Sequence, residues 1–278
     1  MLNQTAERQA IENVKIMKTI SSILISIALV FGIITSYAQE FKYDVKQANQ
    51  VFVKNFSGGI SIEETTGSQL VIETSRYEKK PERADGLKSL YGSGAEDNTG
   101  IGLQVKMNDG VIEIDGASKL AEDAHYTFKV AKGINHKIDY RSPYAGDDVK
   151  VKNFSSELEV SILNPGIVLE NVTGPVILSL TNGNIDIDFG TVNQNSPISL
   201  HATNGIIDIT LPANTPANIS MSTINGEIFT NFDIAFDKKE KNGLSYIGGG
   251  QKIKGTINGG GVDIKLETIN DNIYLRKK

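Results

Sequence analysis

The sequence of 278 residues contains no cysteine, no tryptophan and only three histidines. Without cysteine, the chain can form no disulfide, no thiolate nucleophile and no cysteine-based metal site. With only 7% aromatic residues, the core must be mostly aliphatic, and a sugar-binding face would have to use tyrosine in place of tryptophan. His125, His136 and His201 lie in separate segments without the spacing of a zinc motif or a catalytic triad, so we expect neither function from them.

The N-terminal segment has the pattern of an export signal, with translation starting at Met17. Lys18 supplies a positive charge, residues 20–34 are apolar, and residues 36–38 (Ser-Tyr-Ala) place small side chains before a cut after position 38. The apolar run is short for a membrane span, although an uncleaved anchor is the alternative. We therefore predict a signal peptide at residues 1–38, membrane contact only through it before cleavage, and a periplasmic or surface location.

The charge balance is mildly acidic, with a formal net charge of −5. Removal of residues 1–38, which carry three basic and two acidic side chains, leaves −6. Binding to phosphate backbones needs basic patches, so we exclude a nucleic acid as partner. An envelope protein or a glycan is the partner that we expect, and nothing in the sequence identifies it.

Beyond residue 38, apolar and polar residues alternate with a period of two almost everywhere. In residues 185–189, for example, Ile, Ile and Phe alternate with Asp186 and Asp188. This alternation predicts short strands with one buried and one solvated face, and no segment has the period of an amphipathic helix. We therefore predict an all-β domain over residues 39–278.

Asn-Gly pairs recur between the strands, and we expect them to form structural turns. They are Asn182-Gly183, Asn204-Gly205, Asn225-Gly226 and Asn258-Gly259. Asn-Gly is a strong hairpin signal, so an antiparallel sandwich or barrel is one interpretation. The first three pairs are 22 and 21 residues apart, which favours a parallel β-solenoid (β-helix-like) whose coils turn at equivalent corners. The open ends of such a fold expose unpaired strand edges, and this favours end-to-end self-association.

A second repeat predicts two related halves, 40–140 and 145–278. The letters Val-Lys-Asn-Phe-Ser occur at residues 53–57 and again at 151–155, followed each time by alternating apolar residues. Residues 77–103 interrupt the first half with a charged, glycine-rich and aperiodic excursion. Long loops on rigid scaffolds often carry function, so this excursion is either a functional loop or a disordered flap.

Two stretches resemble a bacterial family called "putative adhesin", which is exported and of unknown function. They are SELEVSILNPGIVLENVTGPVILSLTNGNIDIDF at 156–189 and KGTINGGGVDIKLETINDNIYLRK at 254–277, and the resemblance extends over residues 41–278. Asp271 stands where the family usually has glycine in its last turn. The resemblance implies a right-handed parallel β-solenoid-like fold on a cell-envelope protein, and it implies no reaction.

The outward carboxylates Asp186, Asp188 and Asp208, together with Asp263, are the candidates for a polar site. Stacked coils could align them into a row, as in β-helix polysaccharide lyases and hydrolases that use carboxylates or calcium. Strand alternation by itself already requires polar residues at these positions, so we interpret the row as a solvated face. We predict no catalytic residue, no metal and no cofactor.

Three functional hypotheses follow. The first is a non-enzymatic, exported envelope protein that acts by surface binding, adhesion or scaffolding through a repetitive β-solenoid. The second is a polysaccharide-active β-helix enzyme that uses the aspartate row. The third is a periplasmic accessory or sensor protein for envelope stress.

Overall fold

The computed structural model describes residues 39–143, 147–236 and 251–278, apart from positions 76, 79 and 88. The signal peptide that we predict for residues 1–38 lies outside this range. The described residues belong to one compact unit and form no α-helix, only the short 3-10 helices η1 (Glu82–Ala84) and η2 (Lys119–Ala121). Among them there is no helix long and apolar enough to cross a membrane. The all-β prediction is confirmed.

The strands form two large sheets that are mostly parallel. Sheet A has the order β1-β4-β7-β3-β9-β11-β13-β15-β21-β17, and sheet B has the order β18-β19-β16-β20-β14-β12-β10-β8-β2-β6-β5. The strands, in chain order, are β1 (Gln39–Asp44), β2 (Gln50–Lys54), β3 (Gly59–Thr65), β4 (Gln69–Thr74), β5 (Leu103–Asn108), β6 (Val111–Gly116), β7 (His125–Ala131), β8 (Asn135–Tyr140), β9 (Val149–Lys152), β10 (Leu158–Ile162), β11 (Ile167–Val172), β12 (Val176–Asn182), β13 (Ile185–Phe189), β14 (Ile198–Asn204), β15 (Ile207–Leu211), β16 (Ala217–Thr223), β17 (Ile228–Thr230), β18 (Ala235–Phe236), β19 (Gln251–Ile257), β20 (Val262–Thr268) and β21 (Ile273–Lys277).

Successive strands from β9 to β17 alternate between the two sheets. The odd-numbered strands lie in sheet A and the even-numbered strands in sheet B, so each Asn-Gly corner in this region carries the chain from one sheet to the other. The turns at Asn182, Asn204 and Asn225 are therefore not hairpins, and the antiparallel sandwich does not describe this region. From β9 to β15, each successive strand therefore pairs beside the strand two places earlier in the chain, in the same sheet.

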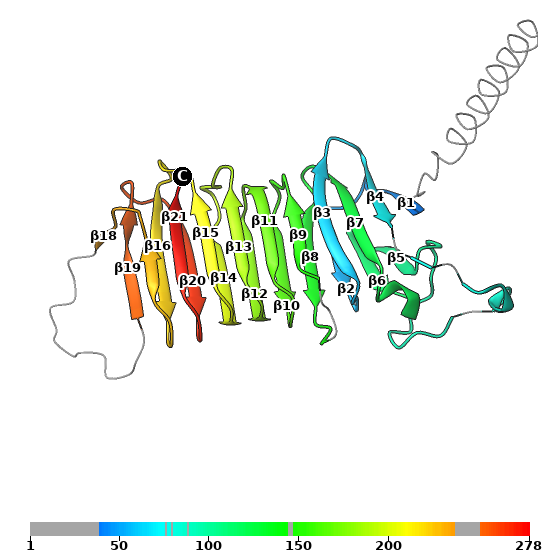
Figure 1. Cartoon of the computed structure of the whole chain (residues 1–278). Helices are drawn as coiled ribbons and strands as arrows, with labels where there is room; N and C mark the ends of the chain where they lie inside the picture. Colours follow the sequence, from blue (N-terminus) through cyan, green and yellow to red (C-terminus); the bar gives the residue numbers. More distant parts are fainter. Residues whose placement is uncertain (1–38, 76, 79, 88, 144–146, 237–250) are drawn as a thin grey trace, which may run out of the picture. The chain divides into compact units, whose positions relative to one another are not determined.

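The last strand pair does not follow this order. Strand β20 lies between β14 and β16 in sheet B, and β21 lies between β15 and β17 in sheet A. Figure 1 shows this insertion as the red strands β20 and β21 between the yellow β14 and β15 and the darker β16. The interval of 21 residues between Asn204 and Asn225 therefore does not make these corners neighbours, because the last strand pair separates them.

The N-terminal part is less regular. Strands β1, β4 and β7 pair antiparallel in sheet A, and β5 pairs antiparallel with β6 in sheet B. The two copies of Val-Lys-Asn-Phe-Ser begin in β2 and β9, which belong to opposite sheets. Asn55 and Asn153 have the same left-handed φ, 50° and 51°, and Phe56 and Phe154 are both buried. The two copies of this repeat thus form the same local structure, a strand followed by a turn, although the strands lie in different sheets.

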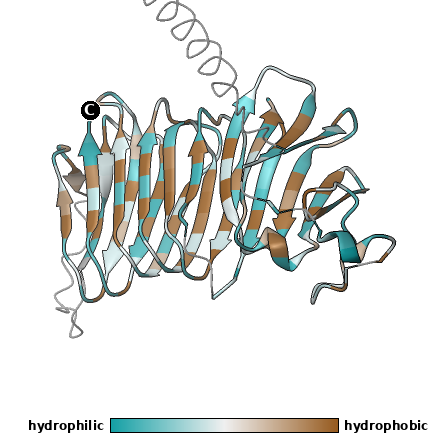
Figure 2. Cartoon of the chain, turned by 45° about the vertical axis from the view of Figure 1, so that its right-hand side comes forward, coloured by the Kyte–Doolittle hydropathy of each residue, from teal (hydrophilic) through white to brown (hydrophobic). Residues whose placement is uncertain are grey.

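The core is built from columns of inward-facing apolar side chains. Figure 2 shows the resulting bands of hydrophobic and hydrophilic residues along the strands. In sheet A, one column is aligned by the strand register and is almost purely β-branched. It runs through Val149, Ile167, Ile185, Ile207 and Ile273, each with 0% of its surface exposed. β-Branched side chains pack well on a pleated surface, and stacking identical residues buries each against its neighbour.

Candidate functional site

The aspartate row lies on the outward face of sheet A. Asp186 on β13 is the register neighbour of Asp208 on β15, and Asp188 is aligned with Thr210. The structure therefore brings two of the predicted carboxylates side by side and leaves the third two residues further along. Asp263 lies elsewhere, on β20 in sheet B, where it accepts a hydrogen bond of 2.9 Å from the Asn218 amide.

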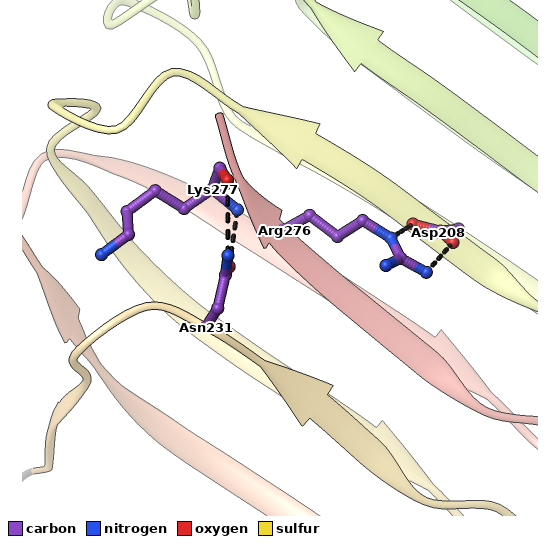
Figure 3. A network of polar contacts seen from close by, with 4 residues as sticks. All are labelled: Asp208, Asn231, Arg276 and Lys277. Carbon is purple, nitrogen blue, oxygen red and sulfur yellow. Dashed lines mark hydrogen bonds and ion pairs between the residues drawn. The ribbon is translucent and has the colours of Figure 1, made fainter.

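Basic side chains near the C-terminus neutralise this row. Arg276 on β21 donates two hydrogen bonds of 2.7 Å to Asp208, one from Nε and one from Nη2, as shown in Figure 3. The ammonium of Lys278 binds Asp188. A two-point contact with a planar guanidinium fixes both partners in orientation. Of the three predicted carboxylates, two are thus held in ion pairs.

Asp186 differs from its neighbours because, among the residues that the structure describes, no basic side chain forms an ion pair with it. Burial raises the pKa of its carboxyl above the usual value, and the nearby charges of Asp208 and Asp148 raise this pKa further. Arg276 acts in the opposite direction, because its positive charge favours the ionised carboxyl. The ion pair between Arg276 and Asp208 raises the pKa of the Arg276 guanidinium, chiefly through the hydrogen bond between the two side chains.

An aromatic pair borders the aspartate row. Tyr274 is the register neighbour of Asp208, and its ring stacks on Phe229 with 5.2 Å between centroids and 12° between planes. The guanidinium carbon of Arg276 lies 5.2 Å from the centroid of Tyr274. Asn231, directly after β17, exchanges two hydrogen bonds with the backbone of Lys277, which fixes this edge of the face (Figure 3). Sequence reasoning missed these contacts because Asp208 and Arg276 are 68 residues apart.

Three of the four predicted turn asparagines, Asn182, Asn204 and Asn225, form a ladder of side-chain amides with Asn164 and Asn270 along one corner. Each Nδ2 donates to the Oδ1 of the next asparagine in the order Asn225, Asn270, Asn204, Asn182, Asn164. Asn164 then donates to the carbonyl of Pro143. Asn270, from the inserted strand pair, was not among the predicted turn residues, because Asp271 replaces the glycine of the Asn-Gly pattern at that corner.

The glycines of these corners have different reasons to be glycine. Gly183 has a φ of +90°, which side-chain-bearing residues rarely adopt. Gly205 has no such φ, but a Cβ there would lie 2.0 Å from the carbonyl oxygen of Gly183 in the neighbouring corner. The second reason is close stacking of backbones, and Gly226 shares it, with 2.0 Å to the Asp271 oxygen.

Asn258 and Gly259 lie in a different kind of turn. They connect β19 to β20, which are both in sheet B on either side of β16. The Asn258 amide donates to the carbonyls of Ala213 and Thr215 and takes no part in the asparagine ladder. Both residues have positive φ, 49° and 85°.

The three histidines occupy three different environments. His125 Nε2 lies 2.9 Å from Ser61 Oγ, and its Nδ1 lies 4.0 Å from Asp147 Oδ2, which is beyond hydrogen-bonding distance for a catalytic relay. His136 is buried edge-on against Phe154, and burial lowers its pKa to about 4. His201 is aligned with Ser179 on β12. Within the described residues, no group of three His, Asp or Glu side chains could hold a metal ion.

The second part of the excursion at residues 77–103 is fixed by hydrogen bonds. The Asp97 carboxylate accepts backbone N–H groups of Gly100 and Gly102, at 2.9 and 3.0 Å. The Asn98 side chain bonds both the N–H and the carbonyl of Val105 on the edge strand β5, at 2.9 Å each. The Asp-Asn-Thr-Gly letters at 97–100 carry the local signal for such a turn, because Asp and Asn side chains bond nearby backbone groups.

Comparisons with known proteins give a limited result. No protein-family model matches the chain, and no curated protein matches its sequence. Two solved structures align with it. The first is "a putative cell adhesion protein" from Clostridium sporogenes, with 14% identity and a TM-score of 0.44 over 87% of this chain and 100% of that one. The second is "a putative adhesin" from Bacteroides fragilis, with 13% identity and a TM-score of 0.32 over 86% and 96%. The first is named for cell adhesion and the second bears the adhesin name of the family that the sequence resembles, and their identities and TM-scores are too low to carry a conclusion about function.

Proposed function

We propose that this protein is a non-enzymatic component of the bacterial cell envelope that is exported and acts by surface binding or scaffolding through a parallel β-solenoid. The observation that carries the proposal is the alternation of β9 to β17 between two sheets, with neighbouring strands paired parallel from β9 to β15 in sheet A and from β10 to β14 in sheet B. Such strand pairs are the coils of a solenoid, in which each coil contacts only its neighbours. The product is a stiff body with two long outward faces.

The binding face that we propose is the outward face of sheet A around Asp186, Asp208, Tyr274 and Arg276. Asp208 and Arg276 are already held by their ion pair and by the ring of Tyr274. A ligand that binds there would find its contacts preorganised, so little side-chain entropy would be lost on binding. Carboxylate, guanidinium and phenol groups beside one another suit an envelope glycan or a polar protein surface.

The alternative of a polysaccharide-active enzyme draws support from one observation, the raised pKa of Asp186. A glycosidase needs such a carboxyl as its acid and a second carboxylate as base or nucleophile. The adjacent Asp208 is the candidate, but Arg276 occupies both of its oxygens. The arrangement supports a static polar face more than a poised acid–base pair.

Binding of the purified full-length protein to isolated cell-envelope material, measured by co-sedimentation, tests the proposal. Asp186→Lys and Tyr274→Ala should abolish sedimentation with the envelope. Ser179→Lys is the matched control, because Ser179 has an outward position on β12 in the opposite sheet. Equal binding of the unchanged protein and all variants would contradict the proposal that this face binds the envelope. Release of reducing ends from envelope polysaccharides, lost in Asp186→Asn, would establish the enzyme instead.

A further inference from the structure

The last strand pair separates two strand pairs that follow each other directly in the chain. Strand β20 pairs with β14 on one side and with β16 on the other, and β21 pairs in the same way with β15 and β17. All four pairings are parallel. Strands β14 and β15 thus form one wall of a slot and β16 and β17 the other. We call β20 and β21, which fill this slot, the insert.

The two walls of the slot carry equivalent residues in sheet B. Ile264 of the insert is the register neighbour of Ile198 on β14 and of Ile219 on β16, and all three side chains are buried. If the walls met in this register, apolar residues would face apolar residues on the inside, and polar residues would face polar residues on the outside. The pairs are Ile198 and Ile219, Leu200 and Met221, Ser199 and Ser220, and His201 and Ser222. Leucine and methionine fill similar volumes, so the core accepts this contact.

The match between the walls extends to sheet A. Ile273 of the insert lies between Ile207 on β15 and Ile228 on β17. Without the insert, two isoleucines at the same register would face each other across the slot. A shift of one residue would turn the apolar side chains of a wall outward, because side chains alternate strictly along a strand. The register that the insert now imposes is therefore also the register in which the empty slot would close.

The corner residues fit either strand order. Asn270 of the insert accepts a hydrogen bond from Asn225 and donates one to Asn204. With the insert absent, the amide of Asn225 stands in the place of Asn270 as the donor to Asn204. Gly205 and Gly226 follow these two asparagines, and a Cβ on either would lie 2.0 Å from a backbone oxygen of the neighbouring corner. Both corners are thus shaped for close stacking of backbones, whichever corner is the neighbour.

The contacts that distinguish the insert from a wall strand lie mainly on the outward face of sheet A. Arg276 binds Asp208 of one wall, and the ring of Tyr274 stacks on Phe229 of the other. The ion pair is largely exposed, and exposed ion pairs stabilise proteins weakly. The aliphatic core favours a filled slot, because the insert buries its own apolar side chains there, but the same core also permits the two walls to meet.

We propose that the insert is detachable, and that β16 and β17 close onto β14 and β15 in the same register when it leaves. The inserted order is the more stable one, because a filled slot has two strand interfaces in each sheet where a closed slot has one. Departure of the insert removes Tyr274 and Arg276 from the outward face of sheet A. A ligand that contacts both side chains therefore binds the inserted order alone and favours it. This coupling to a ligand rests on the proposed function, whereas the change of strand order does not.

Disulfide formation between introduced cysteines in the full-length protein tests the inference. Lys265 on β20 is the register neighbour of both Ser199 on β14 and Ser220 on β16. Neighbouring strands lie about 4.8 Å apart, whereas two strand spacings, about 9.6 Å, exceed the separation of about 7 Å between Cα atoms that a disulfide can span. With the insert unchanged, Ser199→Cys/Lys265→Cys should therefore oxidise to a disulfide within one chain, and Ser199→Cys/Ser220→Cys should not.

A second pair of substitutions then drives the insert out of the slot. Leu266→Asp and Leu275→Asp place carboxylates at two fully buried positions of the insert, where an unpaired charge is costly. In this background the Ser199→Cys/Ser220→Cys disulfide should form at least tenfold faster, while circular dichroism still shows a folded β-protein. Leu266→Met with Leu275→Met is the matched control and should keep the two cysteines apart.

Two outcomes would overturn the inference. Loss of the folded β-structure in the aspartate background would show that the walls cannot close, and a folded protein without the new disulfide would show that they stay apart. Envelope binding is not measured in this experiment, so a failure of the proposed function would leave its result unchanged.

Discussion

The N-terminal region, β1 to β8, and the C-terminal region, β9 to β21, use the same two sheets and stabilise them differently. The N-terminal region mixes parallel and antiparallel strand pairs around an aromatic cluster. In this cluster the ring centroid of Phe56 lies 5.2 Å from that of Tyr126 and 6.2 Å from that of Tyr140. From β9 to β15, the C-terminal region stacks aliphatic columns and an asparagine ladder on parallel strands, with one bulge between Glu170 and Val172. Stacked aliphatic side chains thus form most of the core of the C-terminal region, which also buries Phe154 and Phe189.

The largest expected effect removes one member of the aliphatic column. Ile273 lies between Ile207 and Ile228 in sheet A, and none of its surface is exposed. Ile273→Ala should lower the free energy of unfolding by about 2–5 kcal/mol, because it deletes buried contacts and leaves a cavity. Urea denaturation measures this change. Ile177→Ala, at an outward position on β12, is the control and should change the free energy of unfolding by less than about 0.5 kcal/mol. Equal losses of stability for Ile273→Ala and Ile177→Ala would contradict the buried position of Ile273 in the column.

A pH-dependent effect should arise from a buried histidine in the N-terminal region. Burial lowers the pKa of His136 to about 4, from 6.5 in the unfolded chain. Between these values the unfolded state binds the additional proton, so stability should fall by up to about 3 kcal/mol as the pH drops from 6.5 to 4. Thermal unfolding of wild type and His136→Leu over this range measures the difference. A His136→Leu variant with the same pH slope as wild type would show that another group is responsible.

The asparagine ladder provides a comparison within the C-terminal region. The Asn204 side chain is bonded on both sides, to Asn182 and Asn270, whereas the Asn225 side chain is bonded, among the described residues, to Asn270 alone. Asn204→Ala should cost about 1–2 kcal/mol, because it leaves partners unpaired, and Asn225→Ala should cost about half as much. Differential scanning calorimetry at one protein concentration compares them. If Asn225→Ala costs more than Asn204→Ala, the order of the ladder is wrong.

The smallest effect concerns the ion pair on the outward face. Asp208→Asn should lower stability by about 0.2–1 kcal/mol at low salt, and added salt should reduce the difference, because Arg276 is largely exposed. Ser199→Asn on sheet B is a control that changes an outward side chain without removing an ion pair. A loss that is independent of salt would indicate that Asp208 acts through packing.

The sequence predicts local structure well here and chain order poorly. The alternation in residues 185–189 places Ile185 and Ile187 inward and Asp186 and Asp188 outward, as the burial of β13 confirms. The insertion of β20 and β21 could not be predicted, because the strand pairs of this region present similar aliphatic residues and a corner asparagine to their neighbours. Equivalent sequence in each strand pair specifies that the pairs stack, and it does not specify which pairs are neighbours.

The candidate site shows the same limit. The outward position of Asp208 follows from alternation, whereas its pairing with Arg276 depends on the insertion of β21 beside β15. The contact of Ser61 with His125 likewise joins segments 64 residues apart, and neither residue has a local motif. Long-range contacts of this kind become visible only once the order of the strands is known.

Crosslinking of introduced cysteine pairs tests the central claim most directly, because the chain has no cysteine of its own. Asp208, Tyr274 and Phe229 lie at equivalent outward positions on β15, β21 and β17. With a short thiol-to-thiol reagent such as dibromobimane, the pairs Asp208→Cys/Tyr274→Cys and Tyr274→Cys/Phe229→Cys should crosslink within one chain, and Asp208→Cys/Phe229→Cys should not. Efficient crosslinking of the third pair with failure of the first two would contradict the account, because it would place β15 next to β17, in chain order, with β21 elsewhere.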